Sequence, residues 1–444
     1  MSRNIFLFCL YCLILISWSG YAQESRPNII VFLSDDHGQE DAGCYGNPDL
    51  KTPVIDQLAT EGMRFTHAFT PVSVCAPSRS ALFTGLYPHR NGCDRNHSQI
   101  RSGIKTLPDY LLPLGYEVVL AGKVHVKPEA AFNFTYIGRE EIPAFLKSAG
   151  GKPFCLIISY NSPHQPYFNK KEGYQKVEPK AWLPETAETL QFTEAYYDNV
   201  DHLDHEIGAH LYWVEKYGFS DAFQIYTSDH GPAFPFAKWS LYNQGIRVPL
   251  IVKWKDRIKP GTVNEGLVSL VDLLPTMIEI AGGNPPGDLD GISMKSMLYD
   301  GSSQHLQYVY AAYTNLGVMG ASEYPIRAIQ DKNHKLIVNL RSQNNFEIRR
   351  MNEPDSRALI DSYQVLQSWL KSGNQQYIDR AKANWQHPRL ELYDLNKDPY
   401  ELSNLVADEE MAEIKDKLLS QLAAWMKTQN DPFATELTKI ESAP

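Results

Sequence analysis

The chain has 444 residues, enough to bury one large hydrophobic core and a smaller one, so we expect two domains. Its formal net charge of −10 leaves no basic stripe that would replace the counterions of a phosphate backbone, which argues against a nucleic-acid binder. The composition shows neither a disorder signature nor a repeat period.

The N-terminal segment has the three parts of a secretory signal peptide. Arg3 provides a positive start, residues 5–18 are almost wholly apolar, and residues 20–22 offer a small-residue cleavage site. The apolar run is short for a membrane span, which needs about 20 residues, and no later stretch resembles one. We therefore assign residues 1–22 to a signal peptide and expect a secreted or periplasmic protein, cleaved near Ala22 and without a membrane span.

Four apolar runs predict buried strands, and ionisable residues follow each of them. A continuous hydrophobic run is typical of a central strand that is covered on both faces. Helical patterns at residues 52–62, 193–217 and 272–281 lie between the runs and indicate an α/β sheet. Because ligands bind at the carboxyl ends of such strands, we expect the ionisable side chains to meet at one edge. The runs are residues 28–33, 118–120, 154–158 and 223–226, followed respectively by Asp35 and Asp36, by Lys123 and His125, by His164, and by Asp229 and His230.

A second, smaller domain is predicted after about residue 320. There the apolar runs are short and pair around turns, and an amphipathic helix follows them. We therefore divide the exported chain into a catalytic domain over residues 23–320 and an α+β subdomain over residues 321–444. The predicted strands are residues 326–329, 335–338 and 390–394, the helix is residues 411–427, and residues 351–385 are expected to be irregular.

The segment from Cys75 to Gly85 predicts a cysteine at the start of a helix. Pro77 and Ser78 suit the first turn of a helix, and Gly85 suits its end. Backbone N–H groups and the helix dipole would then favour an anion at Cys75, and Arg79 would lie one turn away on the same face. An isolated cysteine in this place would otherwise be a small core residue or a thiol of low pKa.

Residues 75–79 resemble the C-x-P-S-R signature of the type I sulfatases, in the alkaline-phosphatase-like superfamily, where a maturing enzyme oxidises the cysteine to formylglycine. The resemblance continues through residues 82–85 and 87–92, and includes the paired aspartates at 35–36 and the Asp-His-Gly at 229–231. It covers nearly the whole exported chain. It implies a large mixed, mostly parallel sheet sandwiched by helices, and a hydrolase that removes sulfate from a sulfated glycan.

The resemblance also implies a covalent mechanism beside a metal ion. In these sulfatases a hydroxyl of the hydrated formylglycine attacks sulfur, and a divalent metal neutralises the sulfate oxygens. Oxygen-rich ligation favours calcium, one ion per chain. His230 stands where many relatives carry asparagine, which leaves room for another metal such as zinc. The implied ligands are Asp35, Asp36, the matured Cys75, Asp229 and His230.

The remaining catalytic residues implied by the resemblance bind sulfate or move a proton. Lys123 and His125 lie one residue apart and would face the same side of a strand, and the corresponding pair in sulfatases binds sulfate and assists the formylglycine hydroxyl. His164 would protonate the leaving group, because the pKa of histidine lies near neutral pH. Lys238 would complete the sulfate clamp, and Arg79 would steady the formylglycine and the metal carboxylates.

Several stretches resemble the heparan N-sulfatases (sulfamidases), which cleave a sulfamate from glucosamine. These are residues 122–129, 231–236, 324–329 and 385–394. Lys238 stands where sulfamidases carry arginine, and the two side chains present different donor geometry to an oxyanion. An O-sulfatase that acts on another sulfated polysaccharide therefore stays open beside a heparan-type enzyme. Candidates for the sugar-binding rim are His97, Arg101, Trp239, Tyr242 and Arg327.

Two rival functions have distinct tests. A phosphonate or phosphodiester hydrolase would share the signature and the metal centre, and the ratio of activities on matched sulfate and phosphate esters would separate it. A glycan-binding protein without catalysis would result if Cys75 stayed unconverted.

The other cysteines and histidines receive no catalytic role. Cys44, Cys93 and Cys155 are too few for a disulfide framework, although one bridge from Cys93 to Cys155 or to Cys44 stays open. His37 or His97 would at most line the pocket, and no role is assigned to His89 or His205.

Overall fold

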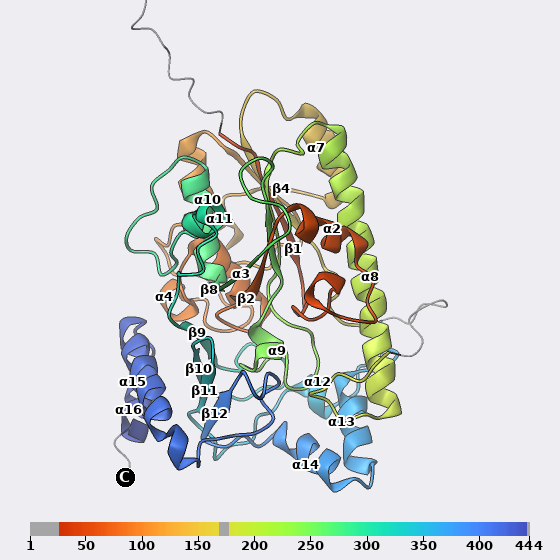
Figure 1. The fold of residues 1–444 in the computed structure, drawn as a ribbon, viewed down its shortest axis with the longest axis vertical. Coiled ribbons are helices and arrows are strands. Elements are labelled where there is room, and N and C mark those ends of the chain that lie inside the picture. Colours follow the sequence, from red (N-terminus) through yellow and green to blue (C-terminus); the bar gives the residue numbers. More distant parts are fainter. Residues whose placement is uncertain (1–25, 168–176, 442–444) are drawn as a thin grey trace, which may run out of the picture.

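The computed structural model describes residues 26–167 and 177–441 of the chain. The predicted signal peptide, residues 1–22, lies outside the described residues. Within them, a large sheet is flanked by helices on both sides, and a smaller sheet lies beyond one end of it (Figure 1). No helix of the described segments has both the length and the apolar character that crossing a bilayer requires.

The larger sheet has eight strands in the order β4-β3-β5-β1-β6-β7-β2-β8. Only β7 runs against its neighbours β6 and β2, and the other neighbouring pairs are parallel. The predicted mixed, mostly parallel α/β sheet is therefore confirmed. The strands are β1 (Ile29–Ser34), β2 (Met63–Phe69), β3 (Glu117–Gly122), β4 (Thr135–Ile137), β5 (Phe154–Ser159), β6 (Phe223–Ser228), β7 (Leu250–Lys253) and β8 (Thr262–Ser269).

Both faces of this sheet are covered, as the continuous apolar runs predict. Along β1, Ile29, Val31 and Leu33 point into one hydrophobic cluster, while Ile30 and Phe32 point into the other, which is the two-residue period of a strand. Helices α3, α5 and α10 lie on the first side, and α2, α7 and α8 on the second. The helices of this part are α2 (Pro53–Glu61), α3 (Cys75–Thr84), α4 (Pro88–Asn91), α5 (Leu107–Leu111), α6 (Glu129–Phe132), α7 (Ile142–Ser148), α8 (Ala187–Lys216), α9 (Asn243–Ile246), α10 (Leu273–Ile280) and α11 (Lys295–Asp300).

The smaller sheet has four antiparallel strands in the order β12-β11-β10-β9. Helix α15 packs on one face through Leu418 and Leu422, and α13 lies on the other side in a separate cluster. Strand β9 precedes residue 320, so this sheet draws one strand from the predicted catalytic domain. The elements are β9 (Val309–Tyr313), β10 (Ile326–Gln330), β11 (His334–Asn339), β12 (Leu390–Asp394), α12 (Arg349–Asn352), α13 (Ser362–Lys371), α14 (Gln375–Ala383), α15 (Ala412–Thr428) and α16 (Ala434–Glu441).

The expectation of an irregular stretch at residues 351–385 is wrong. Asp361 caps α13 by accepting a hydrogen bond from the N–H of Gln364, which satisfies a backbone donor at the helix start. Val365, Leu366 and Trp369 then bury one face of the helix. The predicted long helix also begins earlier than expected, at Ala187, and the four described cysteines are all free, so neither possible disulfide forms.

Candidate active site

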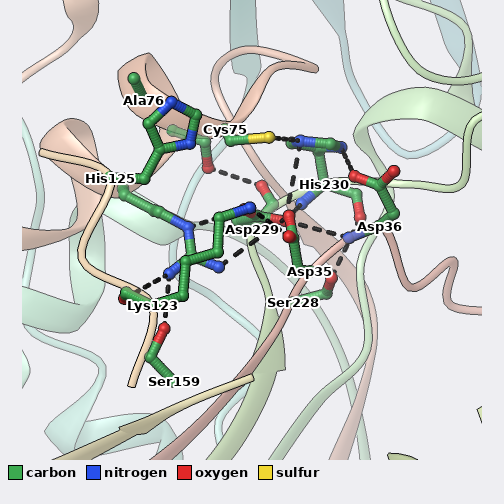
Figure 2. Close-up of polar contacts among 12 residues, drawn as sticks. Asp35, Asp36, Cys75, Ala76, Lys123, His125, Ser159, Ser228, Asp229 and His230 are labelled. Carbon is green, nitrogen blue, oxygen red and sulfur yellow. Dashed lines mark hydrogen bonds and ion pairs between the residues drawn. The ribbon is translucent and has the colours of Figure 1, made fainter. Parts of the chain in front are cut away.

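The carboxyl ends of β1 and β6 bring two acidic pairs together. These strands pair in parallel with Ser34 opposite Ser228, so Asp35 and Asp36 emerge beside Asp229. Asp36 has a φ of 68°, a left-handed conformation that aspartate tolerates better than most residues. The backbone N–H of Asp36 donates to Asp229 Oδ1 at 3.2 Å, which links the two strand ends (Figure 2). The predicted meeting of these residues at one sheet edge is observed.

Cys75 is the first residue of α3, as its sequence context predicts. Its side chain is 3% exposed and faces the acidic pairs in Figure 2. One turn further on, Arg79 is fully buried and donates from Nε to Asp229 Oδ2 at 2.9 Å. A second donor, Nη1, reaches Ser159 Oγ at 2.6 Å. Arg79 therefore connects the helix to the ends of β5 and β6.

Four of the five predicted metal ligands converge. One ligand atom from each lies within 4.8 Å of all the others, and all four residues are buried. Asp229 stands just outside this group, and its oxygens accept hydrogen bonds from Arg79 and from the backbone N–H groups of Asp36 and His230. Its Oδ1 is 3.7 Å from His230 Nε2. The converging residues are Asp35, Asp36, Cys75 and His230.

Two lysines reach the same cluster from different elements. Lys238, in the loop after β6, donates to both oxygens of Asp36 at 2.7 and 2.9 Å and lies 3.7 Å from Cys75 Sγ. Lys123, after β3, forms an ion pair with Asp35. Asp35 Oδ1 is nevertheless buried without a hydrogen-bond partner among the described residues. The cluster thus combines two cations with a carboxylate oxygen that retains binding capacity.

Lys123 and His125 do not lie on a strand, contrary to expectation. Strand β3 ends at Gly122, whose φ is 100° and whose Cβ, if present, would stand 2.2 Å from the Ser159 carbonyl oxygen. A glycine is required at this turn because a side chain would collide with the backbone of β5. Both residues therefore approach the site from a loop, and His125 lies next to Cys75 and Ala76 in Figure 2.

His164 follows β5 in a loop and is half-buried. Its backbone N–H donates to Asn161 at 3.0 Å, and its Nδ1 lies 2.5 Å from the Gln165 carbonyl oxygen. Burial and the nearby Lys238 lower the pKa of His164, but the charges of Asp36 and Asp35 outweigh them and raise it above the usual value. The imidazole is therefore biased toward its protonated form.

The surrounding charges also shift the pKa values of the two groups at the centre of the cluster, Cys75 and His230. Burial raises the pKa of the Cys75 thiol, but the charges of Lys123, Lys238 and His230, together with the His125 imidazole, lower it well below its usual value. For His230, burial lowers the pKa, while Asp229 and Cys75 raise it to about 9. Residue 75 therefore stands in a field that favours negative charge.

The suggested rim residues divide into two groups. Arg327 and Tyr242 are buried and hold carboxylates, Asp431 and Glu391 respectively, so they are packing residues. Trp239 is 4% exposed, with Lys238 Nζ over its ring. Arg101 is exposed, and His97 is exposed and contacts His125.

The other histidines lie apart from the cluster or behind it. His37 is buried under the sheet edge, with Nδ1 2.5 Å from the Tyr226 hydroxyl and Nε2 2.6 Å from the Asp41 carbonyl oxygen. His89 belongs to a buried pair with Asp431, and His205 is exposed on α8. Sequence reasoning missed Ser159, which holds Arg79, and the only available signal was its position at the end of a predicted strand.

A nucleophilic side chain at a helix start, carboxylates at the ends of parallel strands and two converging lysines are typical of a hydrolase that acts on anionic esters. The sulfatase family model matches residues 27–140 and 138–283, more than half of the sequence, and the chain therefore belongs to the sulfatase family. A second family model, described as N-sulphoglucosamine sulphohydrolase, C-terminal, matches residues 231–369.

Individual relatives agree with this assignment. The chain is 37% identical to an ulvan-active sulfatase of Formosa agariphila, over 94% of this chain and 84% of that protein. It is 29% identical to the N-sulphoglucosamine sulphohydrolase of Homo sapiens, over 95% of this chain and 94% of that protein. The predicted sulfatase family, with its resemblance to sulfamidases, is confirmed.

The fold has a close counterpart among solved structures. A protein in complex with its substrate, D-glucosamine-2-N,6-O-disulfate, superposes with a TM-score of 0.72, over 92% of this chain and 99% of that chain. The two sequences are 21% identical, so this likeness supports the fold alone.

Proposed function

We propose that this chain is a sulfatase that hydrolyses sulfate groups of a sulfated glycan through residue 75, converted from cysteine to formylglycine. The observation that carries the proposal is the convergence of Cys75 with Asp35, Asp36 and His230 within 4.8 Å, at the N-terminus of α3. In hydrated form, formylglycine supplies the hydroxyl nucleophile. A maturing enzyme that oxidises Cys75 is the partner that this proposal requires.

Lys123 and Lys238 would bind the sulfate group. Lys238 lies 3.7 Å from the Cys75 sulfur, and the charge of Lys123 is the largest electrostatic contribution that lowers the pKa of the Cys75 thiol. The Lys238 ammonium thus stands beside the atom that would attack, and the charge of Lys123, paired with Asp35, acts on the same atom. A sulfate group bound between them would present sulfur to residue 75, and the two cations would stabilise the negative charge that develops on its oxygens.

His164 would protonate the leaving oxygen or nitrogen. Its pKa is raised by Asp36 and Asp35 against the effect of burial, so a larger fraction of the imidazole carries a proton near neutral pH. Arg79 would act differently, since it is fully buried and contacts Asp229 and Ser159. We assign Arg79 to holding the carboxylates and the helix start in register.

The acidic cluster fits a calcium ion. Asp35 Oδ1 is buried without a hydrogen-bond partner among the described residues, which is a donor atom suited to a cation. Conversion of Cys75 would replace its sulfur by oxygen and leave His230 as the one nitrogen ligand, which favours calcium over zinc. Bound calcium would neutralise charge on the sulfate oxygens. The residues proposed to hold it are Asp35, Asp36, residue 75, Asp229 and His230.

The first substrate candidate is the N-sulfate of a heparan-type glucosamine. The match of residues 231–369 to the C-terminal model of N-sulphoglucosamine sulphohydrolases supports it, as does the human relative at 29% identity. Lys238 lies inside the matched range and stands where sulfamidases carry arginine. Its single ammonium would bind a sulfate oxygen as a point charge, without the paired donors of a guanidinium.

The second candidate is an O-sulfate on another polysaccharide. It is supported by the ulvan-active relative, whose identity of 37% exceeds that of the human enzyme. The lysine at position 238 agrees with this candidate. Sulfamidases carry arginine there, and a pocket without that arginine need not keep their preference for N-sulfate.

Sulfate release from a defined panel tests the proposal. The panel contains heparan disaccharides with a single N-, 2-O- or 6-O-sulfate, ulvan oligosaccharides, and an aryl sulfate with its matched phosphate and phosphonate esters. We expect release from one glycan class and a preference for sulfate over phosphate esters, with Cys75→Ala as the inactive control. A preference for phosphonate or phosphate would contradict the sulfatase proposal, and release from the N-sulfated unit alone would select the first candidate.

We also propose that the protein is exported. The support comes from the sequence of residues 1–22, with Arg3 before an apolar run and a small-residue site at Ala22. N-terminal sequencing of the protein from its native host would show a start near Gln23 if the signal is cleaved, and a start at Met1 would contradict export by this signal.

A further inference from the structure

Two histidines meet at the mouth of the site. His125 Nε2 lies 3.0 Å from His97 Nδ1, and their ring centroids are 4.9 Å apart. Both residues have positive φ, 46° for His125 and 61° for His97. Non-glycine residues in this region persist only where the surrounding structure holds them there, and such positions cluster at functional sites. The pair is therefore a built feature whose hydrogen-bond direction matters.

The direction is set by Asn96. Its Oδ1 lies 3.4 Å from the backbone nitrogen of Ala76, in the first turn of α3. A backbone N–H only donates, so the amide must present its carbonyl oxygen there. The other end of the amide, Nδ2, then faces His97 Nε2 at 3.2 Å. Since an amide nitrogen only donates, His97 Nε2 has to accept.

This arrangement determines where both imidazoles carry their protons. Burial and the neighbouring His125 lower the pKa of His97, which favours its neutral form. A neutral His97 that accepts at Nε2 carries its proton at Nδ1 and donates it to His125 Nε2. His125 in turn carries its proton at Nδ1. That nitrogen is buried and has no hydrogen-bond partner among the described residues.

The free Nδ1–H of His125 has a candidate acceptor in residue 75. The ring lies beside Cys75 in Figure 2, and Nδ1 makes no hydrogen bond to the sulfur of the unconverted cysteine. We propose that Asn96 and His97 form a donor chain that holds His125 as the Nδ1–H tautomer, so that His125 donates a hydrogen bond to the side chain of residue 75. Asn96 and His97 are thus positioning residues, and this inference rests on the proposed function.

The donor chain is anchored by a loop that follows β9. The backbone N–H of Asn96 donates to the Leu316 carbonyl oxygen at 3.1 Å, and Thr314 Oγ1 donates to the Asp94 carbonyl oxygen at 3.1 Å. Gly317, with a φ of 77°, lies so close that a Cβ would stand 2.0 Å from the Asn96 carbonyl oxygen. The chain therefore depends on a segment more than 200 residues away in sequence.

A pair of isosteric variants at His97 tests the donor chain. Asparagine and aspartate both tolerate positive φ, but only asparagine offers an N–H near the position of Nδ1. At pH 8, where an ordinary histidine is neutral, we expect His97→Asn to retain a clearly higher kcat than His97→Asp. His97→Asp should lower kcat by about 10- to 100-fold with KM little changed, the range typical for partners that orient a catalytic histidine. Conversion of residue 75 is measured for each variant by peptide mass.

A second readout does not depend on turnover. Two-bond ¹⁵N correlation spectra of histidine-labelled protein, with His125→Gln to identify the signal, report which nitrogen of His125 carries the proton. We expect protonated Nδ1 and bare Nε2 in the unsubstituted protein and in His97→Asn, and a proton at Nε2 in His97→Asp. A proton at Nε2 of His125 in the unsubstituted protein would overturn the inference, and so would equal losses of kcat in both variants or an effect on KM alone. Absence of sulfate release by fully converted protein would instead sink the proposed function, and the spectra would still decide the tautomer.

Discussion

Two groups of buried charge among the described residues differ in arrangement. On one face of the smaller sheet, Lys335 pairs with Glu401 at 2.8 Å and donates to Asn243 at 2.9 Å. On the opposite face of the same sheet, Arg327 holds Asp431 with two donors. In these two ion pairs, which we call the interface network, each cation faces one carboxylate. At the carboxyl edge of the larger sheet, four potential ligand atoms and two lysines surround a single point instead.

The comparison shows that buried charge alone does not identify a site. The interface network compensates each charge locally, as expected where the purpose is to hold two parts of the chain together. In the edge cluster, Asp35 Oδ1 and Arg79 Nη2 are buried without hydrogen-bond partners among the described residues and face each other only at 4.0 Å. Glu401 Oε1 of the interface network also lacks a hydrogen bond, but it lies 2.8 Å from the ammonium of Lys335. Convergence of charges that the protein itself leaves incompletely satisfied indicates a place for a ligand.

The largest effect is expected at Cys75. Cys75→Ala should lower sulfate release by on the order of 10⁶-fold, the loss that removal of a hydrolase nucleophile produces, without unfolding the protein. Cys155→Ala is the matched control, since Cys155 is equally buried in β5 but far from the chemistry. It should cost about 1–2 kcal/mol of stability and leave kcat unchanged. Retained turnover in Cys75→Ala would remove residue 75 as the nucleophile.

Asp36 tests whether the edge cluster holds a metal. Asp36→Asn removes one of two adjacent carboxylates and the ion-pair partner of Lys238, so we expect loss of bound calcium and a fall in kcat of about 10²- to 10³-fold, by analogy with single losses of transition-state electrostatics. Chelation of the unsubstituted enzyme should reproduce the loss, and added calcium should reverse it. Unchanged metal content in the variant would exclude Asp36 from the ligands.

A substitution at Asp431 tests the interface network. It should lower stability and leave activity nearly unchanged, whereas the substitution at Asp36 should lower activity. Asp431→Asn leaves Arg327 buried without its carboxylate, which should lower the free energy of unfolding by about 3 kcal/mol. Activity per folded molecule should stay within a few-fold. Denaturant unfolding and kcat, measured on the same preparation, separate the two effects. Loss of activity at unchanged stability would show that the network belongs to the site.

His89 gives the interface network a pH dependence. Burial, and then the charge of Arg327, lower the pKa of His89 to about 4, whereas an unfolded histidine titrates near 6.5. The folded state therefore binds fewer protons across this window, so stability falls as the pH drops from 6.5 to 4, by up to about 3 kcal/mol from this residue. Urea unfolding at pH 7, 5.5 and 4 should show a shallower loss in His89→Gln, and an identical slope would contradict this assignment.

The edge cluster was predictable because its signals are local. Two strands that bury both faces are followed directly by ionisable residues, Asp35 and Asp36 after β1 and Asp229 and His230 after β6. Cys75 starts a helix, and Gly85 predicts the end of that helix. Parallel strands bring such residues to one edge without further information. The resemblance to sulfatases then named roles that no pattern of spacing would have supplied.

The parts of the fold and of the site that the sequence did not predict depend on contacts between distant segments. Arg327 resembles a surface arginine in sequence, and only its burial against Asp431 shows that it is structural. Strand β2 pairs with β7 and with β8 in registers that no local sequence pattern predicts. Lys123 and His125 were placed on a strand that ends before them, because Gly122 turns the chain where it meets β5.

The most direct test of the account joins the chemistry of residue 75 to its activity. Protein produced with varied amounts of a maturing enzyme is digested, and the fraction of the Cys75 peptide that has lost about 18 Da, the mass change on conversion to formylglycine, is measured. The same samples are assayed for sulfate release. We expect activity to rise in proportion to the converted fraction and to vanish without it. Activity that is independent of conversion would contradict residue 75 as the formylglycine nucleophile.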